Sequence, residues 1–242
     1  MNFLRSVVFI VWLYGLVVLV GIFGVPFMLL SRGIAVGAVK FWAHSVLWGL
    51  RWICGVKVEF RGLEHRPDGA ALIAGKHLSM LDTIAPFVIL KDPCYVLKKE
   101  LTYLPFFGWY IWRTQMIPVQ RKDAAKALKA MVVDARDRLA HQRQIVIFPE
   151  GTRSELDADP DYKPGVAALY RDLAFPCHLL ATNSGQCWPA HGITRTPGTV
   201  VFEFLPPVPA GLKRGEFMGE IKSRIEAAST QLILEHSKNP GA

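Results

Sequence analysis

A histidine and an aspartate that lie five residues apart form the first candidate for chemistry. His77 and Asp82 stand between an apolar run that ends at Ala74 and another that begins at Ile84. On one continuous helix the two side chains would point about 140° apart, too far round to touch. They can meet if His77 lies in a turn and Asp82 in the first turn of a helix. Asp82 would then orient the imidazole and stabilise its protonated form, as the partner of a general base does. The alternative is a surface histidine beside a helix-capping aspartate.

A second candidate lies at residues 148–154, where the sequence reads FPEGTRS directly after an apolar run. In an α/β sheet, a strand that ends in a polar turn is where sites gather. Gly151 permits a close backbone approach, Thr152 adds a hydroxyl, and Arg153 offers a planar fork that suits a phosphate. The segment therefore predicts a site for a phosphorylated ligand. The alternative for Arg153 is a solvated loop cation paired with a nearby carboxylate.

These residues need a scaffold, and the segments around them alternate between strand-like and helical patterns. Residues 56–60 alternate as in a strand, whereas apolar residues between 124 and 139 recur at three and four positions, as on one face of a helix. Further strand-like runs lie at 70–74, 95–97, 117–119, 145–148, 178–181 and 199–204, and further helical ones at 165–173 and 217–234. Strands that alternate with helices predict an α/β fold with a central mixed sheet flanked by helices, in a domain over residues 56–242.

The N-terminal segment has the length and composition of a membrane helix. Residues 7–30 carry no charge, and at about 1.5 Å per residue they could cross a hydrocarbon core of about 30 Å. The run is longer than the apolar region of a cleaved signal peptide, usually about 7–15 residues, and no small-x-small site closes it. Because Gly21, Gly24 and Pro26 weaken the helix near its end, both a straight span and a kinked, partly embedded helix stay open.

The next segment, residues 34–54, combines aromatic and basic side chains. Helical spacing places three rings on one stripe and three basic groups on the stripe beside it, namely Phe41, Trp48 and Trp52, and Lys40, His44 and Arg51. Such a pairing suits the headgroup layer of a membrane. With a turn at residues 31–33, residues 1–55 are expected to form a membrane-anchoring helical hairpin. The alternative is that the rings pack onto the globular domain as core.

Composition excludes several classes of protein. The chain has 242 residues, of which 51% are hydrophobic and 20% charged, with a formal net charge of +8. Disordered and collagen-like chains do not carry so much apolar material. Every charged residue before Glu59 is basic, and a greasy, basic N-terminus favours a membrane surface as partner over nucleic acid. The four cysteines show no zinc-type spacing, so they are expected to be reduced, and no metal site is predicted.

The two candidate motifs together resemble those of the glycerolipid acyltransferases. In this order, about 70 residues apart after an apolar N-terminus, H-x-x-x-x-D and F-P-E-G-T-R-S are most similar to the motifs of the 1-acylglycerol-3-phosphate acyltransferases of the bacterial type. A second family block is matched loosely by Gly108 and residues 117–121, and a fourth in part by residues 176–185. Two departures stand out: Leu179 replaces a usual proline, and Lys76 replaces a frequent asparagine.

The resemblance implies a role for each candidate residue. His77 would remove the proton from an acceptor hydroxyl as it attacks an acyl thioester, without an acyl-enzyme intermediate, and Asp82 would orient His77. The implied substrate-binding residues are Lys76, Arg121, Glu150, Gly151, Thr152 and Arg153. Within this set the cations would hold the acceptor's phosphate, while Glu150 and Gly151 would shape its pocket. The resemblance implies no metal and no other cofactor.

The implied reaction moves a fatty acyl group to the sn-2 hydroxyl of 1-acylglycerol-3-phosphate (lysophosphatidate) and gives phosphatidic acid. The partners would be lysophosphatidate, acyl-CoA or acyl carrier protein as donor, and membrane lipid. The protein is expected at the cell membrane, with its catalytic domain on the cytoplasmic side. Two alternatives stay open: acylation of another lysolipid, such as lyso-ornithine lipid, and a non-catalytic lipid-binding module. A hydrolase with Ser184 as nucleophile is disfavoured, because the chain has no G-x-S-x-G elbow.

Overall fold

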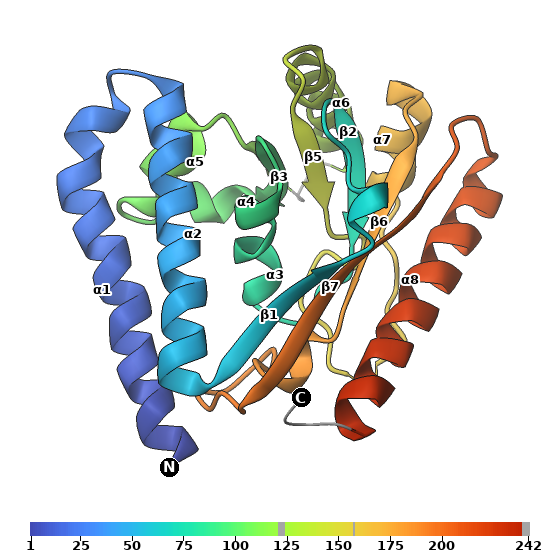
Figure 1. Cartoon of the computed structure of the whole chain (residues 1–242). Helices are drawn as coiled ribbons and strands as arrows, with labels where there is room; N and C mark the ends of the chain where they lie inside the picture. Colours follow the sequence, from blue (N-terminus) through green and yellow to red (C-terminus); the bar gives the residue numbers. More distant parts are fainter. Residues whose placement is uncertain (121–123, 157, 239–242) are drawn as a thin grey trace.

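A helical hairpin lies on one side of a twisted sheet and the C-terminal helix on the other (Figure 1). The computed structural model describes residues 1–120, 124–156 and 158–238. The α-helices are α1 (Asn2–Met28), α2 (Arg32–Cys54), α3 (Leu81–Ile84), α4 (Pro86–Ile89), α5 (Phe107–Arg113), α6 (Ala124–Ala140), α7 (Gly165–Leu173) and α8 (Arg214–Lys238). The strands are β1 (Val56–Arg61), β2 (Ala71–Gly75), β3 (Pro93–Lys98), β4 (Ile117–Val119), β5 (Gln144–Ile147), β6 (Cys177–Thr182) and β7 (Gly198–Val208).

The described residues form one seven-stranded sheet with the order β1-β7-β6-β2-β5-β3-β4. Strand β7 runs antiparallel to β6, and the other neighbouring strands are parallel. This confirms the predicted α/β fold with a mixed sheet flanked by helices. Every residue of the two central strands β2 and β5 is buried, which explains why both read as short, continuous apolar runs.

The register of β2 and β5 determines where the two candidate motifs lie. The strands are parallel neighbours, and Ala74 pairs with Ile147 at their carboxyl ends. The segment that contains His77 leaves β2 one residue after Gly75, and the FPEGTRS segment leaves β5 directly after Ile147. Because parallel strands present their carboxyl ends at one edge of the sheet, the two motifs emerge side by side.

The turn of the N-terminal hairpin differs from the prediction. It was expected at residues 31–33, but Arg32 and Gly33 already belong to α2, and the chain turns at residues 29–31. The reason is a helix cap: the Ser31 hydroxyl accepts a hydrogen bond from the Ile34 N–H at 3.2 Å, which satisfies an otherwise unpaired donor and starts the helix at Arg32. Helix α2 ends at Gly55, whose φ of 70° lies in the left-handed region.

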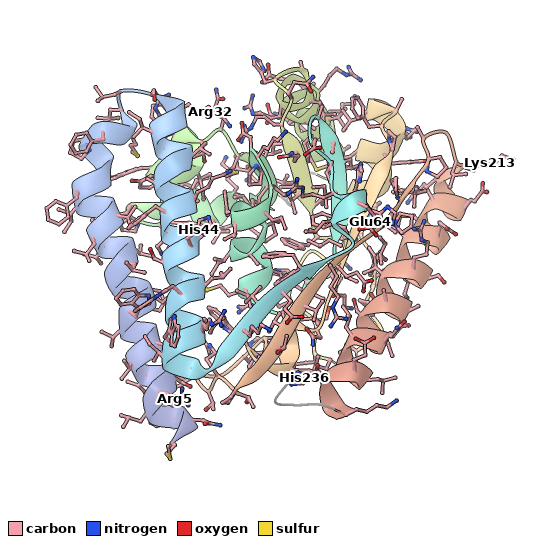
Figure 2. All side chains as sticks on the ribbon, viewed as in Figure 1. Arg5, Arg32, His44, Glu64, Lys213 and His236 are labelled. Atoms are coloured by element: carbon pink, nitrogen blue, oxygen red, sulfur yellow. The ribbon has the colours of Figure 1, made fainter. Side chains whose placement is uncertain are left out.

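Three basic residues of the hairpin bind groups within the protein, although the composition favoured a membrane surface as their partner. Arg5 and Arg32 lie at opposite ends of the hairpin in Figure 2. Arg5 Nε donates to the Ile53 carbonyl, and Arg32 contacts both carboxylate oxygens of Asp92 at 2.6 and 2.8 Å. Lys40 Nζ donates to the Leu90 carbonyl at 2.9 Å. These cations therefore fasten the hairpin to itself and to the sheet domain.

The aromatic stripe of α2 faces outward. Phe41, Trp48 and Trp52 are 63%, 55% and 65% exposed, so they are not core residues of the globular domain. Both α1 and α2 are long and apolar enough to cross a membrane, and most of each helix is not buried inside the protein. The two apolar helices are the feature that indicates membrane association.

The hairpin and the sheet domain share a core. Phe9 and Leu13 of α1 and Leu50 of α2 are buried in the same apolar cluster as the central strands. Helix α2 ends where the division at residue 55 was expected, and β1 begins at Val56, yet the core continues across that point. The hairpin is therefore packed against the sheet domain through a continuous apolar core.

Candidate active site

Hydrogen bonds join the two motif segments at the edge of the sheet. The backbone N–H of His77 donates to Glu150 Oε1 at 2.8 Å, and the backbone N–H of Ser154 donates to the His77 carbonyl at 2.9 Å. The His77 ring also stacks on Phe148, with 4.2 Å between ring centroids and 17° between planes. The imidazole is thus held by its backbone on one side and by a ring contact on the other.

His77 and Asp82 meet as the sequence predicted. His77 lies in the loop after β2, Asp82 lies in the first turn of α3, and His77 Nδ1 is 3.2 Å from Asp82 Oδ2. With Nδ1 directed at the carboxylate, Nε2 is the ring nitrogen available to a substrate. The His77 side chain is 14% exposed, which is enough for contact with a ligand but leaves the ring mostly enclosed.

Asp82 is held more firmly than the sequence could show. It is 1% exposed, and its Oδ2 accepts hydrogen bonds from the backbone N–H groups of Leu78 and Ser79 at 2.6 and 2.7 Å. Its Oδ1 accepts a hydrogen bond from the Ser184 hydroxyl at 2.5 Å. Ser184, which follows β6, therefore supports the aspartate. The Ser184 hydroxyl also accepts a hydrogen bond from Ser79 Oγ at 3.0 Å.

Glu150 connects the two loops from a buried position. Its carboxylate accepts from His77 N and from the Ser154 hydroxyl, and it is 4% exposed. Burial raises the pKa of the Glu150 carboxyl, while the nearby Lys76 ammonium and the two hydrogen bonds lower it. The sequence predicts that Glu150 shapes the substrate pocket; in the structure its carboxylate holds the backbone of His77 and does not line the cavity described below.

Lys76 lies away from the substrate side of the loop. It was expected to hold a phosphate, yet its Nζ is 2.9 and 2.8 Å from the two carboxylate oxygens of Glu226 on α8 and 3.6 Å from Glu150. Lys76 is 4% exposed, and those carboxylates neutralise it inside the protein. We therefore do not retain Lys76 as a phosphate ligand. Glu226 lies 150 residues further along the chain, and no local pattern marks it.

A cavity of about 690 Å³ has the His77 ring in its lining. One part of the lining, called the polar end, consists of Gly151, Thr152 and Arg153 of the second motif and of two cations that the sequence did not assign to the pocket, Lys98 and Lys163. Another part, called the apolar end, comes from α1, α2 and α5, with side chains that include Val17, Val20, Val39, Trp42, Phe107 and Tyr110. Arg121, the other expected phosphate ligand, lies outside the described residues.

The shape and lining of this cavity suit an amphiphilic ligand. Cationic side chains and aliphatic and aromatic side chains both line it, and one of the rings, Phe148, stacks on His77. A headgroup with negative charge fits the cationic part of the lining, and a hydrocarbon chain fits the apolar part. His77 belongs to the same lining, so its ring can reach a ligand bound there.

The part of the chain that the structure describes holds neither a cluster of metal ligands nor a cysteine with a lowered pKa. Among the described residues, no group of three or more His, Cys, Asp or Glu side chains could hold a metal ion. The four cysteines are buried and free. Burial raises the pKa of Cys94 to about 11 and that of Cys177 to about 12, so neither thiol is activated as a nucleophile.

Known proteins share both the sequence and the fold of this chain. A family model described as Acyltransferase matches residues 57–183. The 1-acyl-sn-glycerol-3-phosphate acyltransferase of Pseudomonas aeruginosa is 31% identical over 199 residues, which are 82% of this chain and 77% of that protein. The 1-acyl-sn-glycerol-3-phosphate acyltransferase alpha of Homo sapiens is 28% identical over 167 residues, 68% of this chain and 59% of its own length. A crystal structure of the 1-acyl-sn-glycerophosphate acyltransferase from Thermotoga maritima has the same fold, with a TM-score of 0.77, 18% identity, and coverage of 96% of this chain and 99% of that one.

Proposed function

Because this chain belongs to the acyltransferase family, we propose that it moves a fatty acyl group from a thioester to the sn-2 hydroxyl of lysophosphatidate and so forms phosphatidic acid. The observation that carries the proposal is the His77–Asp82 pair at the mouth of a cavity with a cationic and an apolar end. Both substrates of this reaction are amphiphiles with an anionic group and a hydrocarbon chain.

In the proposed mechanism His77 acts as general base. Nε2 takes the proton from the acceptor hydroxyl while the hydroxyl oxygen attacks the thioester carbon. Asp82, fixed by Leu78, Ser79 and Ser184, keeps Nδ1–H directed toward its carboxylate and stabilises the imidazolium that forms. When the carbon–sulfur bond breaks, the imidazolium returns its proton to the departing thiolate. The ester oxygen keeps the acyl group, and the enzyme ends the cycle unchanged.

The cations at the polar end provide the acceptor's binding site in this proposal. Arg153, Lys98 and Lys163 line the same cavity as His77, and in this proposal they hold a phosphate next to the reacting hydroxyl. Arg121 joins them as a proposal from the sequence alone. Thr152 and Gly151 line the same wall, the first with a hydroxyl and the second with a φ of 69° that only glycine adopts easily.

The transferred acyl chain occupies the apolar end of the cavity in this proposal. The reacting carbon must lie beside His77, and the chain attached to it must extend away from the cations. The apolar wall formed by α1, α2 and α5 provides that direction. The hairpin, residues 1–55, would thus both attach the protein to the membrane and form part of the pocket of the catalytic domain, residues 56–242.

The remaining assignments follow from the solubility of the substrates. Lysophosphatidate resides in the bilayer, whereas acyl-CoA or acyl carrier protein arrives from the aqueous phase. We therefore place the protein at the cell membrane, with the catalytic domain on the cytoplasmic side. No cofactor takes part in the proposed reaction.

The direct test is an assay of the purified full-length protein in lipid vesicles with several labelled lysolipids and with both donor types. We expect turnover of lysophosphatidate. Turnover of lyso-ornithine lipid alone would assign the enzyme to another acceptor, and vesicle binding without transfer to any lysolipid would indicate a lipid-binding module instead.

A further inference from the structure

An ionic cluster in which Lys76 and Glu150 are buried and Glu226 is 27% exposed lies behind the two motif loops, on the side of the sheet that α8 covers (Figure 1). Lys76 contacts both oxygens of Glu226 at 2.9 and 2.8 Å, and its Nζ is 3.6 Å from Glu150 Oε1. The Tyr162 hydroxyl donates to Glu226 Oε1 at 2.9 Å. The cluster is thus held together from the loop after β2, the loop after β5, the segment before α7, and α8.

This cluster is connected to the catalytic histidine by one further contact. Glu150, which shares the Lys76 ammonium with Glu226, is also the acceptor for the backbone N–H of His77. A chain of charge-assisted contacts therefore runs from Glu226 through Lys76 and Glu150 to His77. In the related acyltransferase motif an asparagine is frequent at the position of Lys76. In this chain the position holds a lysine, and Glu226 is the carboxylate that pairs with it.

The geometry points to Glu226 as a positioning residue for acyl transfer: it holds the Lys76 ammonium in place beside Glu150, and Glu150 fixes the backbone of His77. This inference rests on the proposed function, since it assumes that His77 is the base. None of these three supporting side chains lines the cavity, so they act through His77 and do not touch the substrate.

The charges in the cluster determine what each substitution does. The ionisable groups that face Glu150 are Lys76, Glu226 and, beyond Glu226, Tyr162. Lys222 pairs with Asp159 at 2.8 Å, and the nearby Glu226 carboxylate also raises the pKa of Lys222. Lys76→Met leaves two carboxylates facing each other without their cation. Because like charges and burial both favour the protonated form, the pKa of Glu150 rises further, and its hold on the His77 N–H weakens as pH falls.

The test compares Lys76→Met, Glu226→Gln, the double variant and Glu220→Gln in the vesicle assay. Glu220→Gln is the matched control, because Glu220 is on the same helix and pairs with Arg224 on its exposed surface. We expect Glu226→Gln to lower kcat several-fold, and Lys76→Met about tenfold, with unchanged KM for lysophosphatidate, since small displacements of a catalytic group are costly.

The pH profile separates positioning from a merely structural role. We expect the acid limb of kcat for Lys76→Met to move to higher pH, and the double variant, which removes one of the facing carboxylates, to move it back. The inference is overturned if Glu226→Gln matches Glu220→Gln in kcat, or if Lys76→Met loses activity only in proportion to its folded fraction, with no shift of the profile. If His77→Ala stayed active, the proposed function itself would fail; if His77→Ala were inactive and Glu226→Gln neutral, only this inference would.

Discussion

At the polar end of the cavity, hydrogen bonds from several segments hold His77 and Asp82. The apolar end is walled by aliphatic and aromatic side chains of α1, α2 and α5, where the Tyr110 hydroxyl donates to the Val20 carbonyl. The two ends should respond differently to substitution. Loss of a hydrogen bond between buried groups leaves an unpaired polar atom and lowers stability. An apolar wall tolerates replacement of one side chain by another, and the change alters the volume of the cavity. We therefore expect substitutions at the polar end to change the rate of acyl transfer, and substitutions at the apolar end to change which acyl chain is accepted.

The largest loss of activity at the polar end is expected from Asp82→Ala. General-base catalysis contributes about 10²–10⁴-fold, and we expect kcat to fall within this range because His77 loses its orienting partner. Stability should fall as well, since the buried N–H groups of Leu78 and Ser79 lose their acceptor at a cost of about 1–3 kcal/mol each. Steady-state kinetics and thermal melts measure the two effects. Asp68→Ala, at a residue whose side chain is 72% exposed, is the control; equal losses in both variants would refute the role of Asp82.

A smaller effect is expected at the same end from Arg153→Ala. An exposed arginine that binds phosphate should affect acceptor binding more than chemistry, so KM for lysophosphatidate should rise about tenfold with a modest change in kcat. Arg153→Lys should retain part of the affinity. A matching rise in KM for a lysolipid without phosphate would show that Arg153 does not recognise the phosphate.

The smallest effect should come from the apolar end, through Val20→Phe. The added ring shortens the cavity, so donors with long acyl chains should lose efficiency by about fourfold for each methylene excluded, while short-chain donors react normally. Val18→Phe is the matched control, because Val18 is also on α1 and is 45% exposed. An equal loss with all chain lengths would mean that the acyl chain does not lie against α1, and that the apolar end does not select the acyl chain.

Local pattern was sufficient for most of the scaffold. Strands such as β2 and β5 have continuous apolar runs, and α7 has strict helical spacing, so the sequence locates all three. The short α5 was not expected. It has seven residues, mostly aromatic, and its helical form is supported by contacts with α1, such as the hydrogen bond from Tyr110 to the Val20 carbonyl.

For the site, the sequence identified pairs close in the chain but not the distant partners that support them. The meeting of His77 with Asp82 could be predicted because a turn followed by a helix start is a local event. Ser184 lies 102 residues after Asp82, and Glu226 lies 150 residues after Lys76. Only the tertiary fold brings the two residues of each pair together. For the same reason the sequence predicts that Lys76 binds the substrate's phosphate. A cation next to a catalytic histidine suggests a phosphate ligand, and the carboxylates that pair with Lys76 are visible only in the structure.

The decisive measurement is acyl transfer to lysophosphatidate by His77→Ala in vesicles, with vesicle binding recorded on the same sample. His141→Ala, whose side chain is 70% exposed, serves as the control. We expect a loss of about 10²–10⁴-fold in kcat for His77→Ala with unchanged vesicle binding, because in our proposal the hairpin, and not the base, attaches the protein to lipid. Transfer by His77→Ala at the rate of the His141→Ala control would show that His77 is not the general base.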